Sequence, residues 1–263
     1  MLAPSEIDPF ETHNVGHLSP SSINEYIQNP SRWLLRVSGY RDNSGIPAMW
    51  RGIAVDKAIT KALFEPELSD EQVLEYANSE FEINHLGAID GGADINDKKL
   101  ISEQAALPRY LSVALPHFRS LGTPIASQKK IKIDLDAISV PIIGYIDLLY
   151  DGVVRDIKTV GRLPSRVPDT TCRQLSIYAK AENAMPIIDY VHCTKSMAQV
   201  AVMRVPNQDV HWGVAVCAAK NMARLLSYSP DIQEVAQLLV PDLDDWRWSA
   251  GEKQAAKRLW GLK

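Results

Sequence analysis

The chain has 263 residues, 46% of them hydrophobic, so it is long enough to bury a sizeable core. Its formal net charge of −4 argues against a protein that coats nucleic acid through bulk positive charge. No window approaches about 18 uninterrupted apolar residues, and the N-terminal segment has neither the basic nor the apolar region of a signal peptide. We therefore expect a cytoplasmic protein that does not enter membranes.

The first 37 residues are predicted to be a lead-in followed by two short helices. Residues 1–17 lack periodicity and should form a loose segment. A helix pair is expected over 19–37, because Ser19 suits an N-cap and Asn29-Pro30 should break the first helix before the second begins.

Two helical regions are predicted next. Residues 51–64 place apolar side chains at helical spacing, with Asp56 on the margin of the apolar stripe, so this helix is expected to pack against a sheet. Residues 65–121 are predicted to form a helical insertion, in which Pro108 and Pro116 break the last helical run.

The central part of the chain has β-type periodicity. Apolar and charged residues alternate over 129–159, which predicts an antiparallel meander of three strands. A helix, a strand pair and a helical C-terminal region should follow over 170–183, 187–193 with 198–204, and 207–263. This order of elements is typical of an α/β protein, and the length allows one large domain or two small ones.

The stretch over 144–159, GYIDLLYDGVVRDIKT, reads as a hairpin whose Asp-Gly pair forms a two-residue type I′ turn. Counting back from this turn places Asp147 directly opposite Asp156. Like charges at opposed positions destabilise a strand pair, and without a counter-charge one carboxyl group is expected to raise its pKa and stay protonated. Lys158 stands two positions after Asp156 and therefore on the same face.

A divalent cation would offset this repulsion more completely than a single lysine can. Hard cations such as Mg²⁺ take carboxylate oxygens as ligands and keep several waters. Asp147 and Asp156 are therefore candidate metal ligands, and the Lys158 amine can orient or deprotonate a water beside them. This set of groups is typical of metal-assisted phosphodiester hydrolysis.

Four sequence blocks follow one another between about Leu18 and Tyr178. They are LSPSSINEY with NPSRW, RGIAVDKAI, GYIDLLYDG with DIKT, and a helix that carries Gln174 and Tyr178. Their order and spacing resemble the PD-(D/E)XK nuclease superfamily in its RecB-like branch, which includes phage recombination exonucleases. The resemblance implies a single domain over residues 1–263, with a restriction-endonuclease-like mixed α/β core and flanking helices.

The resemblance also implies roles for single residues. Asp147 and Asp156 would be the metal-binding acids, the main-chain carbonyl of Ile157 a further ligand, and Lys158 the catalytic lysine. Asp56 stands where many relatives have a histidine and others a glutamate. An aspartate there can still bind Mg²⁺ or Mn²⁺, the implied cofactor, although its side chain is shorter.

DNA is the implied partner. Gln174 and Tyr178 lie four apart on one helical face and match positions that line the DNA side of the site in this family. Lys130, Arg162 and Arg173 are candidates for contacts to the phosphate backbone, which give sequence-independent affinity. A single-strand annealing protein or a recombinase is a candidate protein partner, and the oligomeric state stays open.

The leading hypothesis is a Mg²⁺- or Mn²⁺-dependent deoxyribonuclease, bacterial or phage-encoded, that acts as an exonuclease on double-stranded ends in recombination or repair. An endonuclease or junction resolvase would use the same metal site. A DNA-binding relative that has lost cleavage, with Asp56 as the altered position, is a third hypothesis, and an α/β domain that binds a small acidic ligand is a fourth. Asn29 stands where iron-sulfur members have a cysteine, so we expect no iron-sulfur cluster.

Overall fold

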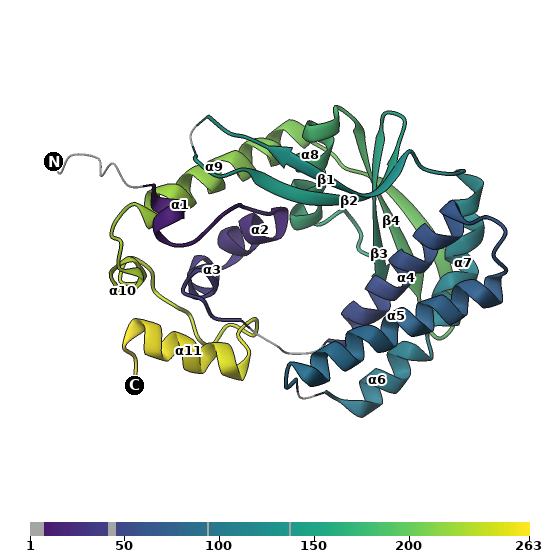
Figure 1. Cartoon of the computed structure of the whole chain (residues 1–263), viewed down its shortest axis with the longest axis horizontal. Helices are drawn as coiled ribbons and strands as arrows, with labels where there is room; N and C mark the ends of the chain where they lie inside the picture. The colour runs from purple at the N-terminus through teal and green to yellow at the C-terminus, as the bar shows by residue number, and fades with distance from the viewer. Residues whose placement is uncertain (1–7, 42–45, 94, 137) are drawn as a thin grey trace.

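The computed structural model describes residues 8–41, 46–93, 95–136 and 138–263. In this part of the chain, helices surround a five-stranded mixed sheet with the order β1-β2-β3-β4-β5 (Figure 1). The strands are β1 (Ala126–Ile133), β2 (Ile142–Tyr150), β3 (Val153–Val160), β4 (Met185–Cys193) and β5 (Ala198–Arg204). The predicted α/β class with a restriction-endonuclease-like mixed sheet is confirmed.

The sheet joins an antiparallel meander to a strand pair. β1, β2 and β3 are antiparallel neighbours, as predicted, and β4 pairs with β5 in the same manner. β3 and β4 are parallel, because α8 (Asp169–Glu182) crosses between them. This crossover helix carries Gln174 and Tyr178 back over the sheet.

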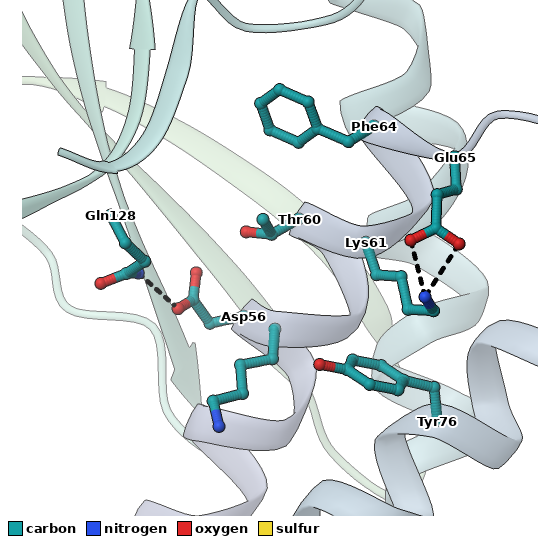
Figure 2. A pocket seen from close by; sticks show the side chains of 8 residues that line it. Asp56, Thr60, Lys61, Phe64, Glu65, Tyr76 and Gln128 are labelled. Atoms are coloured by element: carbon teal, nitrogen blue, oxygen red, sulfur yellow. Dashed lines mark hydrogen bonds and ion pairs between the residues drawn. The ribbon is translucent and has the colours of Figure 1, made fainter.

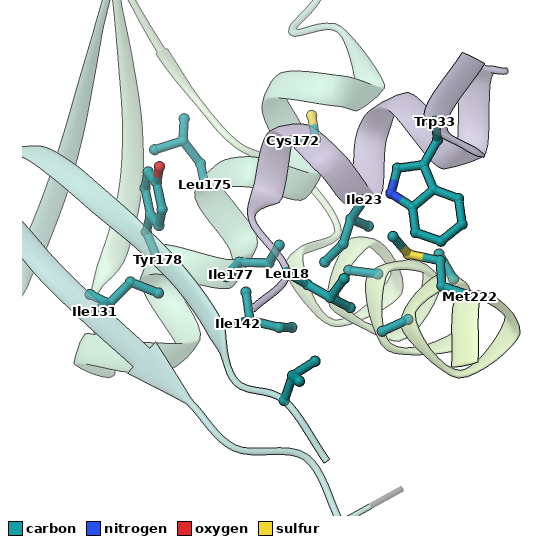
Figure 3. Packing of buried hydrophobic residues seen from close by; sticks show 14 of the residues in the cluster. Leu18, Ile23, Trp33, Ile131, Ile142, Cys172, Leu175, Ile177, Tyr178 and Met222 are labelled. Atoms are coloured by element: carbon teal, nitrogen blue, oxygen red, sulfur yellow. The ribbon is translucent and has the colours of Figure 1, made fainter. Parts of the chain in front are cut away.

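One face of the sheet packs against α2 (Pro20–Gln28) and α8, and α9 (Gln208–Leu226) packs against these two helices. Figure 3 shows the core between these elements, where Leu18 and Ile142 lie beside Ile177 of α8 and Met222 of α9. The Ser19 side chain accepts a hydrogen bond from the backbone N–H of Ser22, which confirms the predicted N-cap. The flanking helices α3 (Pro30–Val37), α10 (Ile232–Ala236) and α11 (Ala250–Trp260) extend this layer.

The predicted loose lead-in over 1–17 is wrong for its described part; residues 1–7 lie outside the described residues. A short helix, α1 (Pro9–Thr12), places Phe10 in the core with no exposed surface. The His13 ring lies 3.0 Å from the Ser229 carbonyl oxygen and so links this segment to the C-terminal region. Burial of one large aromatic side chain orders the segment, although its sequence has no periodicity.

The other face packs against α4 (Pro47–Phe64) and α7 (Leu107–Ser120), with α5 (Asp70–Asp90) and α6 (Asp97–Gln104) outside them (Figure 1). The helices predicted over 51–64 and within 65–121 are therefore present. Pro108 stands at the start of α7 as expected, but Pro116 lies inside it, so the predicted break there is wrong. Pro116 is exposed while neighbouring Leu115 and Phe118 are buried, and this packing offsets the lost hydrogen bond.

None of the described helices combines the length and the apolar character needed to cross a membrane.

Gly144 allows α8 to pack closely on β2. A Cβ atom at Gly144 would lie 2.6 Å from Cε1 of Tyr178 and 3.4 Å from Pro20. We predict that Gly144→Ala lowers the free energy of unfolding by about 1–3 kcal/mol, because the buried Tyr178 ring must move. Urea denaturation measures this change.

The matched control is Gly213→Ala in α9, where an added Cβ meets nothing within 4 Å. This helix-interior substitution should instead raise the free energy of unfolding by about 0.5–1 kcal/mol. Equal effects at the two glycines would show that the contact with Tyr178 does not limit substitution at Gly144.

Candidate active site

Asp147 and Asp156 lie where β2 and β3 stop pairing. The register predicted from the Asp-Gly turn is confirmed for the three pairs next to it, the last of which joins Leu148 to Arg155. The ladder ends there, one position before the two aspartates would face each other. The backbone N–H of Ile157 donates a hydrogen bond to Asp147 Oδ2 at 2.9 Å. A hydrogen bond to the Asp147 side chain thus joins β2 to β3 beyond the last backbone pair of the two strands.

Asp156 has partners on both of its carboxylate oxygens. Lys158 Nζ lies 2.7 Å from Oδ2, and Gln174 Nε2 donates to Oδ1 at 3.0 Å. Gln174 Nε2 also donates to the Tyr178 hydroxyl at 3.3 Å. Asp156 is 1% exposed, whereas the Lys158 side chain is 40% exposed, so the amine lies between a buried carboxylate and solvent. The structure therefore brings these four predicted residues together.

Asp56 of α4 faces β1. Its Oδ2 accepts a hydrogen bond from Gln128 Nε2 at 3.1 Å, and Figure 2 shows the two side chains pointing toward one another. Gln128 has a φ of 46°, a left-handed conformation that is uncommon for a residue other than glycine. Asp56 Oδ1 is buried and has no hydrogen-bond partner among the described residues. Gln128 is not among the site residues predicted from the sequence, and nothing in its local pattern indicates this role.

These charged groups shift one another's protonation. Burial, and then the charge of Asp156, raises the pKa of Asp56 to about 6. Burial and the charges of Asp156 and Asp56 raise the pKa of Asp147 well above its ordinary value. Burial lowers the pKa of Lys158, but Asp156 and Asp147 outweigh this effect and raise that pKa above its ordinary value. Lys158 is therefore a cation at neutral pH that faces more negative charge than it can balance.

Among the described residues, no three His, Cys, Asp or Glu side chains converge as the ligands of a bound metal do. The donor chemistry nevertheless fits a divalent cation. Asp56, Asp147 and Asp156 interact electrostatically, and Asp56 Oδ1 is a buried oxygen to which no described residue donates a hydrogen bond. Hard cations bind such carboxylate oxygens. These three residues could hold Mg²⁺ or Mn²⁺, and the Ile157 carbonyl stays a predicted ligand.

A cavity of about 500 Å³ opens beside Asp147. Gln174, Tyr178 and Lys130, three of the residues predicted to contact DNA, line it together with Gln128. The exposed Lys130 side chain places a positive charge on the rim of this cavity.

The two predicted arginines lie elsewhere. Arg162 is exposed just beyond the end of β3 and does not line the cavity. Arg173 is 7% exposed, and its Nε donates to Asn24 Oδ1 at 2.7 Å, which ties α8 to α2. The structure thus gives Arg173 a packing contact and leaves little of it for a ligand to reach.

The mixed sheet and the acidic pair beside a lysine define an α/β protein of the nuclease type. A family model described as the PD-(D/E)XK nuclease superfamily matches residues 17–256. The chain therefore belongs to the PD-(D/E)XK nuclease superfamily. No curated protein matches the chain at a significant level.

A solved structure shows the same fold. A provisionally named exonuclease from Eubacterium rectale aligns over 92% of this chain and 90% of its own, with a TM-score of 0.54 and 12% identity. A second structure, SSO0001, aligns over 84% of this chain and 93% of its own at 16% identity, but its TM-score of 0.33 is too low to support an inference.

The raised pKa of Asp56 predicts a stability change with pH when a chelator removes divalent cations. The folded chain holds this proton up to about pH 6, whereas the unfolded chain releases it near pH 3.8. The free energy of unfolding should therefore fall as pH rises between these values. We predict that Asp56→Asn reduces the fall between pH 4.5 and 7.5 by about 2 kcal/mol. Urea denaturation in EDTA at several pH values measures the free energy of unfolding of both proteins.

Added Mg²⁺ provides the control, because a bound cation offsets the repulsion that raises this pKa. The wild-type protein should gain stability at pH 7.5 on addition of Mg²⁺, and Asp56→Asn should gain less. An unchanged pH profile in Asp56→Asn would contradict the buried, repelled state of Asp56.

Proposed function

We propose that this nuclease is a divalent-metal-dependent deoxyribonuclease with its active site at Asp56, Asp147, Asp156 and Lys158. The observation that carries the proposal is the 2.7 Å ion pair between Lys158 and Asp156, placed beside Asp147 where β2 and β3 separate. Membership of the nuclease superfamily supports the hydrolysis of phosphodiester bonds. The cavity lined by Asp147 and Tyr178 offers space for a DNA strand beside these groups.

Each residue has a separate task in the proposed reaction. Mg²⁺ or Mn²⁺ would supply Lewis-acid stabilisation of the charge that develops on the scissile phosphate. Asp147, Asp156 and Asp56, with the Ile157 carbonyl, are the proposed ligands. Lys158 is a cation, so it donates hydrogen bonds that orient a water and stabilise phosphate oxygens. Gln174 fixes the Asp156 carboxylate by its bond to Oδ1.

Lys130 and Arg162 are the proposed contacts to the phosphate backbone. Lys130 lines the cavity, and Arg162 is exposed beyond β3. Both can bind phosphate without reading sequence. Arg173 is not included in this set, because its guanidinium is buried against Asn24. Tyr178 lines the same cavity as Lys130 and is a proposed contact for the DNA strand.

We further propose that the enzyme is an exonuclease of the RecB-like branch, acting on double-stranded DNA ends in recombination or repair in the cytoplasm. The fold shared with a provisionally named exonuclease supports this reading. The site would work with a single-strand annealing protein or a recombinase that takes up the resected strand. A structure-selective endonuclease is the alternative, since the same acidic groups would serve both activities.

We predict that Asp147→Ala and Lys158→Ala each reduce cleavage of linear duplex DNA in Mg²⁺ or Mn²⁺ by at least about 100-fold. The Asp147→Ala substitution removes a proposed metal ligand, and Lys158→Ala removes the cation that stabilises the developing charge. Release of labelled nucleotides from a linear duplex measures the rate, and EDTA should abolish it.

Asp134→Ala and Lys132→Ala are matched controls. Their side chains are 73% and 60% exposed and form an ion pair at 3.2 Å on β1 and the turn after it. Both variants should cleave at the wild-type rate. Wild-type rates in Asp147→Ala and Lys158→Ala would refute the assigned active site. Nicking of covalently closed circles would favour the endonuclease alternative.

A further inference from the structure

A second cavity adjoins the candidate active site. It has a volume of about 320 Å³ and lies between α4 and α5, where Asp56, Thr60 and Phe64 of α4 face Gln128 and Tyr76 closes one side (Figure 2). Volumes near this value are typical of small-ligand pockets. Gln128 lines both this pocket and the cavity beside Asp147, so the pocket begins at the candidate metal ligands.

The two ammonium groups of this pocket are already paired. Lys61 Nζ lies 2.7 and 2.8 Å from the two carboxylate oxygens of Glu65, and 5.1 Å from the centre of the Tyr76 ring. Lys57 Nζ lies 2.6 Å from Glu80 Oε2. Each ammonium is thus matched by a carboxylate. A phosphate group would gain little positive charge here, so the pocket favours a ligand part that carries no charge.

The remaining lining groups suit a flat ring with polar edges. The Phe64 side chain is large and apolar, yet Phe64 is 44% exposed. Thr60 Oγ1 is a buried polar atom without a hydrogen-bond partner among the described residues. Thr60 lies one helical turn after Asp56, on the side of α4 that faces Gln128 (Figure 2). Nucleobases stack on aromatic rings and form hydrogen bonds at their edges.

We propose that this pocket receives the base of the nucleotide next to the scissile phosphate, unstacked from the duplex. Its face would lie against Phe64 and its edge toward Thr60, while the phosphate stays at Asp147. The assignment rests on the proposed nuclease function. It is consistent with the charge balance of the pocket, since the base is the uncharged part of a nucleotide. Unstacking is easiest where a base is not held in a paired duplex, as at a frayed end.

The test removes the base and the Phe64 ring, first separately and then together. Linear duplexes carry one abasic nucleotide, placed at each position near the end in turn, and kcat/KM is measured for the wild type and Phe64→Ala. We expect Phe64→Ala to lower kcat/KM on intact duplex about tenfold, the scale of one lost base stacking contact. One abasic position should lower the wild-type value similarly. The two changes together should cost no more than either alone, because they remove the same contact.

Tyr228→Ala is the matched control, since Tyr228 is also an exposed aromatic residue, at 60%, but lies just beyond the C-terminal end of α9. This variant should keep the wild-type response to every abasic position. Additive losses at all positions, or wild-type kcat/KM for Phe64→Ala, would overturn the assignment of the pocket while leaving the nuclease function intact. Absence of any cleavage by the wild type would instead overturn the proposed function.

A binding measurement tests the pocket without cleavage. A duplex carries 2-aminopurine at the position where the abasic nucleotide and Phe64→Ala are not additive. This duplex is titrated with protein in Ca²⁺. Wild-type protein should change its fluorescence as the base leaves the stack, and Phe64→Ala should reduce that change. Equal changes for both proteins would show that the base does not contact Phe64, and the proposed pocket would be rejected.

Discussion

Repulsion among three carboxylates is the constraint on which the candidate active site depends. Asp56, Asp147 and Asp156 come from one helix and two strands, and Lys158 is the ammonium group placed among them. Burial with like charges has a free-energy cost that apolar side chains would not have. The shifted pKa values of Asp56 and Asp147 express this cost. A cation can compensate for it, which links this part of the fold to the proposed chemistry.

Contacts of the residues before and after Asp156 in β3 keep the carboxylates from moving apart. After Asp156, α4 approaches β3 so closely that a Cβ on Gly52 would lie 3.3 Å from Thr159 Oγ1. Asp56 stands one helical turn after Gly52, so this contact also fixes its distance from the strand. Before Asp156, Arg155 donates to the fully buried Asp189 at 2.6 Å and joins β3 to β4. The scaffold therefore resists the relaxation that would remove the repulsion.

Local geometry made the centre of this site predictable from the sequence. A two-residue turn sets the register of its own hairpin, and the helical period places Gln174 and Tyr178 on one face. The contact between Gln128 and Asp56 was not predictable, because it spans 72 residues and requires a left-handed backbone at Gln128. Charge alone likewise could not reveal that Arg173 is buried, since its exposure depends on how α2 packs against α8. The helices and strands followed from periodicity and the restriction-endonuclease-like type from the family resemblance, whereas long-range contacts required the structure.

The overall acidity of the chain limits how DNA can be held at this site. Lys129 and Lys132 of β1 are each paired with a carboxylate, whereas Lys130 and Arg162 form no ion pair in the described part of the chain. A DNA complex held by these two cations would release few counterions, so it should depend only weakly on salt. Affinity must then come from contacts that salt does not screen, such as stacking on an exposed ring like that of Phe64. The net negative charge of the chain disfavours non-specific coating of DNA. For the same reason, DNA affinity should depend on contacts with the bases beside the reacting phosphate.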